Sequence, residues 1–470
     1  MDDSGLKETV LVGLSSQGVE IRATPVRLTR YLVVFEIYRE GNLLQVSEVL
    51  SDFRIIIHDR MLYSGRAIVK NLIDTGLIVL CEASLEDSWM DAELLASDPR
   101  PERVQKEFGE FFREWQKVYR ILPEYKLLAA DIHSFLTDFR LWVEQVELGI
   151  RALPMGDRNE RERQTAASIA AAAFQGLDAL FGQFERIAGT IDPELRPAHE
   201  VYVRRQIHPL VLCAPFAFRS VQKPLGYAGD YEMVNMICRD PHEGGSLFAK
   251  VLNRWFVTQA PAEAHRNRIH YLVEQLINET MRVRSAGGIC RVFNAGCGPA
   301  GEVQRFMADS ELASHARFVL LDFNEETITH ARQVLEAARH KHGRTTQLDF
   351  TKKSVVQLLR GRSKAAVGAS NNYDFVYCAG LFDYLPDSVC RQLIGVFYDL
   401  LAPGGLLVVT NVEPSNPIRH WLAYILDWHL IYRNAKQLLQ LCPEPLAENS
   451  RIRSDPTGVN LFMEVRRPVS

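Results

Sequence analysis

A glycine-rich segment near residue 296 restricts the fold of the C-terminal part of this chain more than any other feature. The apolar residues 290–294 lead into the sequence NAGCGPAG (residues 294–301), which places glycines at positions 296, 298 and 301. Glycines at this spacing permit a tight turn between a strand and a helix, and they let a ligand approach the backbone. The segment therefore predicts the first strand, turn and helix of a ligand-binding α/β sheet.

Further strand-like runs follow this turn and alternate with helical stretches. They cover residues 317–321, 373–378, 406–410 and 458–465. Such alternation is typical of a parallel, doubly wound sheet. Asp322 follows the second strand, about 20 residues after Gly301, where a carboxylate accepts hydrogen bonds from both ribose hydroxyls. These features fit a nicotinamide cofactor as well as S-adenosylmethionine.

Two further motifs separate these cofactors. The strand at 373–378 ends in AGLFDYLP (residues 379–386), and LLAPGG (residues 400–405) runs into the next strand. Together with the glycine-rich turn and Asp322, they resemble the class I S-adenosylmethionine-dependent methyltransferases over about 180 residues. The resemblance implies a Rossmann-like sheet and S-adenosylmethionine as the cofactor.

The resemblance also implies which residues bind the cofactor. The glycine-rich turn would surround its methionine end, Asp322 its ribose, and Asp349, after the third strand, its adenine. Asn294 departs from the family pattern, which more often has Asp or Glu there, so water-mediated contact with the cofactor's ammonium is altered. Arg266 and Arg268 are candidates to pair with a carboxylate of the cofactor or the substrate. The predicted cofactor-binding residues are Asn294, Gly296, Gly298, Gly301, Asp322, Phe323, Asp349, Phe350, Ala379 and Arg266.

Two segments outside these motifs bear on the methyl acceptor. The sequence PLGYAGDYE (residues 224–232) combines glycines, tyrosines and acids in a loop, which suits close approach of a ligand. Residues 421–433 are aromatic-rich and are predicted to form a helix. From residue 224 onward the chain resembles bacterial methyltransferases labelled as forming 3-hydroxy fatty acid methyl esters of the extracellular-factor type.

That second resemblance implies O-methylation of a fatty or other apolar carboxylic acid. N- or O-methylation of another small metabolite, transfer of another arm of the cofactor, and a cofactor-binding sensor without turnover remain as alternatives. A carboxylate acceptor needs alignment and desolvation more than a strong base. A phenol or an amine would need a general base, for which Asp383, Asp230 and His429 are candidates, although His429 is expected to be a packed core histidine. The predicted catalytic residues are Tyr227, Asp230, Tyr231, Asp383 and Tyr384.

The N-terminal part of the chain reads as β structure. Short β-branched runs at 32–38, 54–58, 67–69 and 76–82 are separated by Gly, Asn and Asp, which predicts a small barrel or sandwich. This zone resembles a PilZ domain, a barrel that in some proteins binds cyclic di-GMP through an RxxxR run and a (D/N)xSxxG motif. Here Arg22 and Arg27 are five residues apart, with Arg30 beyond them, and Ile73 replaces the serine. We therefore expect a structural barrel that does not bind cyclic di-GMP.

The middle of the chain is predicted to be helical, with helices near 128–152, 160–188 and 262–284. Residues 104–122 carry an aromatic stripe at spacings of three and four, which indicates one packed helix face. We expect the barrel to pack on this helix, with a homodimer as one arrangement. We expect the helical zone, with its loop at residues 226–232, to form a lid and wall over the acceptor pocket. The stripe comprises Val104, Phe108, Phe111, Phe112, Trp115, Val118, Tyr119 and Leu122.

Composition excludes several other classes of protein. The 470 residues carry a formal charge of −4, without the basic excess of a nucleic-acid-binding protein. No stretch reaches the 18 or so apolar residues of a membrane span, and the acidic N-terminus does not resemble a signal peptide. The eight cysteines are scattered without a CxxC pair, which indicates reduced thiols, no metal site and a cytoplasmic protein.

The sequence therefore predicts a multidomain α/β protein. We expect a PilZ-like β-barrel over residues 1–97, a helical domain over 98–285 and a methyltransferase domain over 286–470. Its partner would be a small-molecule acceptor.

Overall fold

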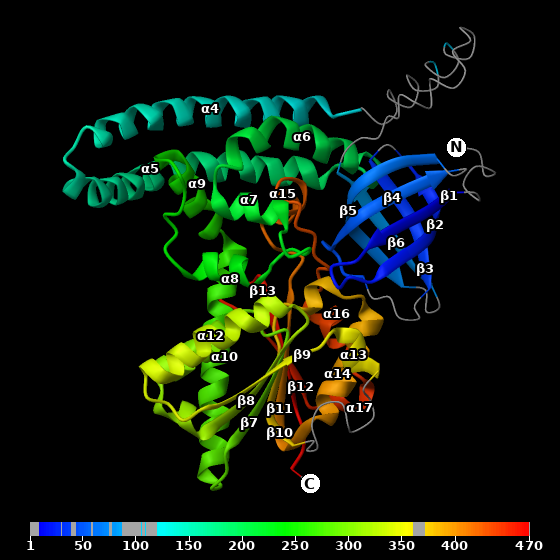
Figure 1. The fold of residues 1–470 in the computed structure, drawn as a ribbon, viewed down its shortest axis with the longest axis vertical. Helices are drawn as coiled ribbons and strands as arrows, with labels where there is room; N and C mark the ends of the chain where they lie inside the picture. The colour runs from blue at the N-terminus through cyan, green and yellow to red at the C-terminus, as the bar shows by residue number, and fades with distance from the viewer. Residues whose placement is uncertain are drawn as a thin grey trace.

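The computed structural model describes residues 9–29, 31–38, 44–57, 60–74, 78–86, 120–360 and 372–469, besides the single residues 105 and 109. Figure 1 shows three parts: an N-terminal barrel, a helical layer that includes a long hairpin, and an α/β sheet. The barrel and the helical layer both meet the upper edge of the sheet in this view (Figure 1).

The N-terminal strands close into an antiparallel barrel with the order β1-β2-β3-β6-β5-β4. Its interior is filled by β-branched and aromatic side chains such as Val33, Phe35, Phe53 and Ile55, which are fully buried. The predicted small barrel is therefore confirmed, and the strands at the N-terminal end, which were not predicted, complete it. The strands are β1 (Thr9–Leu14), β2 (Glu20–Leu28), β3 (Leu32–Tyr38), β4 (Val49–Ile57), β5 (Arg60–Asp74) and β6 (Ile78–Leu85).

Between the barrel and the sheet in sequence, the described residues form the helices α4 to α10. The three helices predicted here are present as α4, α5 and α10, whereas the shorter helices α6 to α9 were not predicted. The expected packing of the barrel on the aromatic stripe falls outside the described residues, of which only Leu122 belongs to the stripe. The helices are α4 (Pro123–Arg151), α5 (Met155–Gly189), α6 (Arg196–Val211), α7 (Pro215–Gln222), α8 (Tyr231–Cys238), α9 (Leu247–Val257) and α10 (Ala260–Ser285).

The C-terminal sheet has seven strands in the order β12-β13-β11-β10-β7-β8-β9. Strands β7 to β11 are parallel, as predicted, while β13 pairs antiparallel with β11 and β12 with β13. The strands are β7 (Cys290–Ala295), β8 (Ala316–Asp322), β9 (Gln347–Lys352), β10 (Tyr373–Cys378), β11 (Leu401–Val412), β12 (Ser450–Ser454) and β13 (Asn460–Arg466).

Helices cover both faces of this sheet (Figure 1). On one face lie α10, α11 (Gly301–Asp309) and α12 (Glu325–Lys341); on the other lie α13 (Val355–Arg360), α14 (Asp387–Asp399) and α16 (Ala435–Leu439). The strand order reverses between β7 and β10, and open α/β sheets bind ligands at such a switch point, outside the carboxyl ends of the strands. The topology therefore places the expected site at the upper edge of the sheet in Figure 1.

The helix predicted over residues 421–433 is wrong for most of its length. Only α15 (Arg419–Tyr424) is helical, and Trp421 stacks on Trp255 at a centroid distance of 5.6 Å in the helical core. The helix ends at Tyr424, and three residues later Asp427 has a φ of +53° and a carboxylate 2.7 Å from the ammonium of Lys70. Ionic contacts with distant segments therefore override the local apolar periodicity.

Three further findings concern the described part of the chain. None of its helices combines the length and apolarity that crossing a membrane requires. All eight cysteines are free thiols. Among the described residues, no group of three acidic, histidine or cysteine side chains is arranged to hold a metal ion.

Candidate active site

A pocket opens at the carboxyl ends of β7, β8 and β10, where the strand order reverses. Its walls come from the glycine-rich turn, the residues after β8 and β10, α8, α10, the loop before α8, the segment 412–430 and the barrel. Most of the residues predicted to bind cofactor or acceptor line it. These are Tyr227, Tyr231, Asn294, Gly296, Gly298, Gly301, Asp322, Phe323, Ala379, Asp383 and Tyr384.

The glycine-rich turn is folded back onto the end of β8. The backbone N–H groups of Gly296 and Cys297 both donate to the carbonyl of Leu321, at 2.8 and 2.9 Å. Gly296 and Gly298 have φ of +71° and +53°, which a residue with a Cβ adopts only at a cost. The glycines therefore allow the backbone of this turn to face the pocket.

Asp322 is held rigidly beside this turn. One carboxylate oxygen accepts from the N–H of Gly298 at 3.2 Å and the other from the N–H of Asn324 at 3.1 Å. Burial raises the pKa of Asp322 to about 6, although these backbone donors counteract the shift. A fixed carboxylate at the end of the second strand fits a ligand with vicinal hydroxyls.

A second buried carboxylate, Glu302, lies at the opposite side of the turn. Its Oε1 accepts from the hydroxyl of Tyr377 at 2.7 Å and from the amide nitrogen of Asn294 at 3.1 Å. Burial raises the pKa of Glu302. The amide oxygen of Asn294 is buried and has no hydrogen-bond partner within the described residues. Glu302 and Asn294 therefore present an unpaired acceptor and a negative charge to the pocket, which fits a ligand ammonium.

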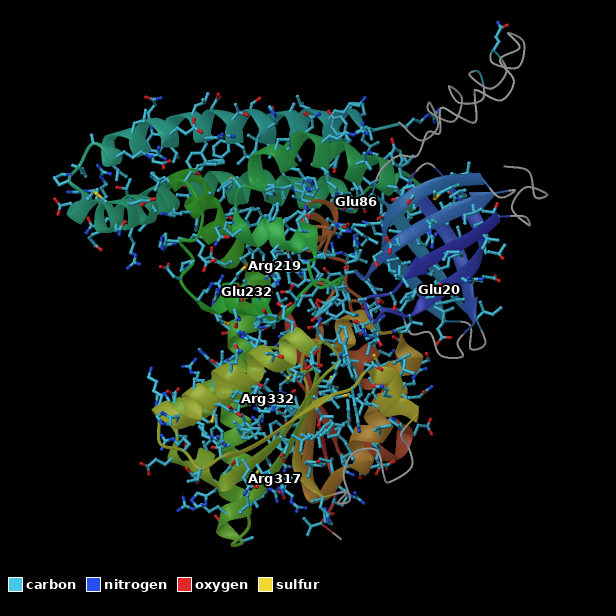
Figure 2. All side chains as sticks on the ribbon, in the orientation of Figure 1. Glu20, Glu86, Arg219, Glu232, Arg317 and Arg332 are labelled. Carbon is cyan, nitrogen blue, oxygen red and sulfur yellow. The ribbon has the colours of Figure 1, made fainter. Side chains whose placement is uncertain are left out.

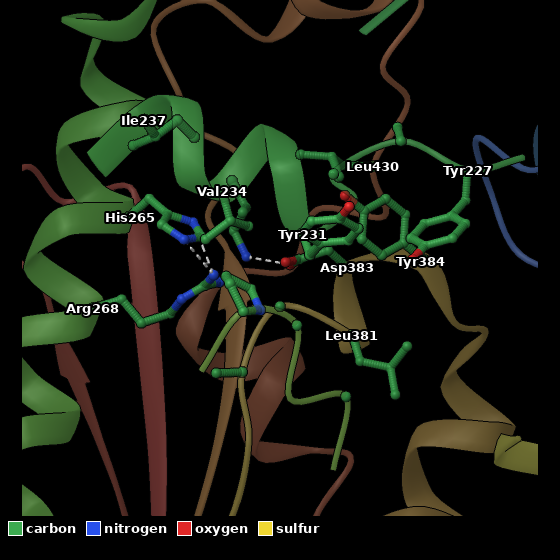
Figure 3. Close-up of a pocket in the computed structure, with 18 of the residues that line it drawn as sticks. Tyr227, Tyr231, Val234, Ile237, His265, Arg268, Leu381, Asp383, Tyr384 and Leu430 are labelled. Carbon is green, nitrogen blue, oxygen red and sulfur yellow. Dashed lines mark hydrogen bonds between the residues drawn. The ribbon is translucent and has the colours of Figure 1, made fainter. Parts of the chain in front are cut away.

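Arg268 supplies a positive charge next to these acids. Its guanidinium is buried and donates to Nδ1 of His265 at 2.8 Å, and it makes no ion pair with a carboxylate in the described part of the chain. Burial and the two neighbouring arginines, Arg268 and Arg266, hold the pKa of His265 well below its usual range, so His265 is neutral. Figure 3 shows both side chains reaching from α10 into the pocket. Arg268 can bind a ligand carboxylate here.

Gly380 makes room for this arginine. A Cβ at Gly380 would lie 2.8 Å from Nη1 of Arg268, and its φ is +92°. The glycine of the AGLFDYLP motif therefore lets the guanidinium approach the end of β10.

The remainder of the pocket is mostly apolar. Its polar side chains include Asp383 and Tyr384, opposite Arg268 (Figure 3), besides Gln17, Gln45, Gln259, Lys353 and Asn460. Asp383 accepts from the N–H of Val412 at 2.7 Å, and burial raises its pKa to about 6. The hydroxyl of Tyr384 accepts from Nε1 of Trp428 at 2.9 Å. The apolar walls are Phe216, Phe256, Ile418, Trp421, Leu422, Trp428 and Leu430.

The three candidates in the loop before α8 have different environments. Tyr227 packs on Phe323 with a centroid distance of 5.0 Å and lines the pocket. Tyr231 also lines it, but its hydroxyl donates to Glu326 at 2.7 Å. Asp230 does not line the pocket, so its prediction as a catalytic residue is corrected.

Asp230 instead stabilises the fold. Its Oδ1 accepts from the N–H groups of Glu232 and Met233 at 3.1 and 3.0 Å, so it is the N-cap of α8. Its other oxygen pairs with Arg219 at 2.8 Å. The acidic residue in this loop is therefore a helix cap and not a general base.

Asp349 and Phe350 do not line the pocket, contrary to prediction. Strand β9 continues to Lys352, so the residue at the pocket after this strand is Lys353. Asp349 instead pairs with Arg317 at 2.9 Å. Figure 2 shows Arg317 at the lower end of the sheet, whereas Arg219 of α7 lies above its upper edge. Phe350 lies under the guanidinium of Arg332 at 4.9 Å. The strand end was predicted four residues too early, at residue 348 instead of 352.

Arg266 is also outside the pocket. Its guanidinium donates to the carbonyls of Ile237 and Val257, both at 2.9 Å, and pairs with Glu263 at 2.7 Å. Its role is to tie α10 to the ends of α8 and α9. Of the two arginines considered, Arg268 faces the pocket because it lies two positions further along α10, on a different side of the helix.

His429 does not line the pocket and is almost fully buried beside Asp427 and Lys70. Burial, followed by the charge of Lys70, lowers the pKa of His429 to about 4. It is therefore a neutral, packed histidine, as expected.

Sequence reasoning missed several polar side chains that line the pocket, among them Glu302, Gln17 and Gln45. Glu302 lies one position into α11, directly after the glycine-rich turn, and an acid at that position was the available signal. The two glutamines come from the barrel, and nothing local in the sequence relates them to the glycine-rich turn.

Comparison with known proteins identifies the domain around this pocket. Residues 293–407 match the family described as methyltransferase domain. No curated protein is significantly similar in sequence to this chain.

Several solved structures overlap with parts of the fold. A Bordetella parapertussis protein is 17% identical, with 64% of this chain and 97% of that chain covered and a TM-score of 0.41. Magnesium protoporphyrin IX methyltransferase from Synechocystis PCC 6803 is 16% identical over 45% and 87%, with a TM-score of 0.32. An N-methyltransferase from Bradyrhizobium japonicum WM9 is 17% identical over 51% and 98%, with a TM-score of 0.31. Because these sequence identities and TM-scores are low, the domain is identified by the family match.

The pocket fits the cofactor of such a domain. Asp322 suits its ribose, the orphaned oxygen of Asn294 with Glu302 suits its ammonium, and Arg268 suits its carboxylate. The family match and this donor set together identify the C-terminal part of the chain as an S-adenosylmethionine-dependent methyltransferase domain.

Proposed function

We propose that this methyltransferase transfers a methyl group to the oxygen of an apolar carboxylic acid, with a fatty acid as the favoured class. The observation that carries the proposal is the composition of the acceptor half of the pocket. Most of its walls are aromatic and aliphatic, and its polar side chains include Asp383 and Tyr384, close to Arg268. An acyl chain would bury its apolar surface there while its carboxyl group faced the cofactor.

The protonation states of the pocket residues support an acceptor that is already ionised. Burial raises the pKa values of Tyr227 and Tyr384 and lowers that of His265 far below neutrality. The tyrosines are therefore neutral donors at pH 7, and His265 accepts from Arg268. A carboxylate needs no proton removed before it attacks, so this set of groups suffices.

The residues would act by orientation and desolvation. When bound, S-adenosylmethionine supplies an electrophilic methyl group. Asp322, Glu302 and Arg268 would hold the two ends of the cofactor, and this fixes the direction of transfer. The aromatic walls would exclude water from the acceptor carboxylate, which makes it a stronger nucleophile. Tyr384, held by Trp428, would donate to the carboxylate oxygen that does not react.

The resemblance of the C-terminal part to the 3-hydroxy fatty acid methyl ester group agrees with this acceptor class. A second candidate, methylation of a phenol or an amine, is favoured by Asp383. Its pKa of about 6 is suited to a general base near neutral pH, and it lies in the pocket beside Tyr384.

Incubation of the purified protein with methyl-labelled S-adenosylmethionine and decanoic acid tests the proposal. Tyramine, which offers a phenol and an amine, is the comparison acceptor. We expect a labelled methyl ester of decanoic acid and no label in tyramine. Label in tyramine that is abolished by Asp383→Asn would establish the second candidate instead. Binding of S-adenosylhomocysteine without label in either acceptor would contradict both.

A further inference from the structure

Two loops of the N-terminal barrel reach the active-site pocket. Gln17 lies in the turn between β1 and β2, and Gln45 lies in the segment before β4; both line the pocket. Gln45 is only 5% exposed. Neither side-chain amide forms a hydrogen bond with another residue in the described ranges. Two polar side chains with open donors and acceptors therefore face the site from a part of the chain outside the methyltransferase domain.

The barrel is attached directly to the loops that form the site. The N–H of Val46 donates to the carbonyl of Tyr384 at 3.2 Å, and the N–H of Val49 donates to that of Gly226 at 2.7 Å. The hydroxyl of Ser47 donates a hydrogen bond to the carbonyl of His429 at 2.9 Å. The barrel thus contacts the motif after β10 and the loop before α8 through main-chain hydrogen bonds, and the segment after α15 through the Ser47 side chain.

A buried carboxylate fixes both barrel loops. Oε1 of Glu48 accepts from the N–H and the hydroxyl of Ser16, at 2.8 and 2.6 Å, while Oε2 accepts from the N–H of Gln45 at 2.8 Å. Glu48 is 1% exposed and has no ion pair in the described part of the chain. The described hydrogen-bond partners of its carboxylate are Ser16, adjacent to Gln17, and Gln45 itself. A buried charge used in this way rigidifies the loops it bonds.

Gln17 lies at the end of the pocket where Asp322 and Phe323 are found. A second cavity, with a volume of about 590 Å³, adjoins this end and lies between the barrel and the sheet. Gln17 and Phe323 line both cavities. The barrel turn therefore forms one side of the opening at which the ribose-binding carboxylate is located.

We propose that Gln17 is a further binding residue for the nucleoside end of S-adenosylmethionine, and that Glu48 is the positioning residue that holds it there. An amide offers a donor and an acceptor together, which matches the edge of an adenine or a pair of ribose hydroxyls. The barrel is then part of the cofactor site and not only a scaffold. This inference goes beyond the proposed acceptor and rests only on the identity of the cofactor.

Calorimetry with S-adenosylhomocysteine tests the inference without any acceptor. We expect Gln17→Ala and Glu48→Gln each to weaken binding about tenfold, the effect of one hydrogen bond to a polar ligand. The double variant should be no weaker than the more affected single variant, because both substitutions remove the same contact. Arg22→Ala, on the barrel surface with a side chain 74% exposed, is the matched control and should bind as the wild type does.

Unchanged affinity in Gln17→Ala would overturn the inference. So would additive losses in the double variant, because these would show that Glu48 acts through general stability. Glu48→Gln is nearly isosteric, and circular dichroism with a thermal melt would establish that the barrel is intact. If decanoic acid is not methylated while Gln17→Ala still weakens S-adenosylhomocysteine binding, the proposed acceptor fails and the role of the barrel is supported.

Discussion

The amide nitrogen of Asn294 donates to the carboxylate of Glu302 at 3.1 Å, so the negative charge missing at position 294 is supplied from the first turn of α11. The hydroxyl of Tyr377 donates to the same oxygen at 2.7 Å. The pocket therefore keeps an anionic group near the glycine-rich turn, although Asn294, near the end of β7, carries an amide in place of a carboxylate.

Glu302→Gln should separate cofactor affinity from stability. The variant keeps an oxygen for Tyr377 and Asn294 but loses the charge, so we expect S-adenosylhomocysteine binding to weaken by about 1–2 kcal/mol. The free protein should be as stable as the wild type or more so, because a buried, unpaired charge is removed. Calorimetry and chemical denaturation measure the two effects. A loss of stability with unchanged affinity would show that Glu302 has only a structural role.

The affinity for S-adenosylhomocysteine should rise with pH between 5 and 7. Burial raises the pKa of Asp322 from 3.8 to about 6, and only the ionised carboxylate accepts from both ribose hydroxyls. In the free protein the raised pKa has the opposite effect: the stabilisation that comes from protonated Asp322 is present at low pH and is lost as the pH rises through about 6. Binding constants at three pH values check the first effect.

Asp322→Asn is the control for that profile and should flatten it. Asp322→Ala should weaken binding by about 1–3 kcal/mol, since two ribose hydroxyls lose their partner. A pH profile that is equally steep in Asp322→Asn would assign the titration to another group.

Asp230→Ala and Tyr227→Phe should have different consequences, although the two residues share one loop. Asp230 caps α8 and pairs with Arg219, so its removal should cost about 2–4 kcal/mol of stability. Tyr227→Phe removes only a hydroxyl at the pocket and should lower turnover while S-adenosylhomocysteine affinity stays nearly unchanged. Denaturation midpoints and steady-state rates distinguish them. Equal destabilisation of both variants would mean that the whole loop is structural.

Asp427→Asn should strongly destabilise the junction of the three parts of the chain. Its carboxylate contacts Lys70 of the barrel at 2.7 Å, Arg204 of α6 at 2.7 Å and Lys223 after α7 at 3.1 Å. Although burial opposes it, these cations hold the pKa of Asp427 well below its usual range. The substitution leaves the cations without this partner, at a cost of about 3–5 kcal/mol.

Asparagine tolerates the φ of +53° at this position, so the backbone should not add to the cost. Glu20→Gln, which removes an exposed ion pair with Arg22, is the matched control and should change stability by less than about 1 kcal/mol. Similar unfolding midpoints for the two variants would contradict a structural role for the junction.

The barrel should not bind cyclic di-GMP below about 10 µM, because holding two phosphates requires paired arginines with polar groups beneath them. Arg22 is paired with Glu20 at 2.6 Å, and Ile73, in the position of the motif's serine, is 52% exposed and offers no donor. Titration with fluorescent cyclic di-GMP measures this. Submicromolar binding that is lost in Arg22→Ala or Arg27→Ala would overturn the expectation.

The sequence by itself determined the local architecture of the sheet and of its ligand-binding turn. Gly296 and Gly298 adopt positive φ, which glycine permits because it has no Cβ. The apolar run before them and the run that ends at Asp322 form strands, whose geometry depends on a few consecutive residues. For the same reason the β-branched runs predicted a small barrel, and the apolar periodicity predicted α4, α5 and α10. These features depend on interactions between neighbours in the chain.

Only the tertiary structure decided which polar side chains meet at the pocket. Asp349 was misplaced because β9 runs four residues further than its local pattern indicates, and strand ends are set by pairing with β8. The helix expected over residues 421–433 ends early because Asp427 binds cations from three other segments. Gln17 and Gln45 reach the site from 279 and 251 residues away in the chain, where no local pattern relates them to the turn at Gly296. Long-range packing fixes such contacts, and residue spacing alone does not encode it.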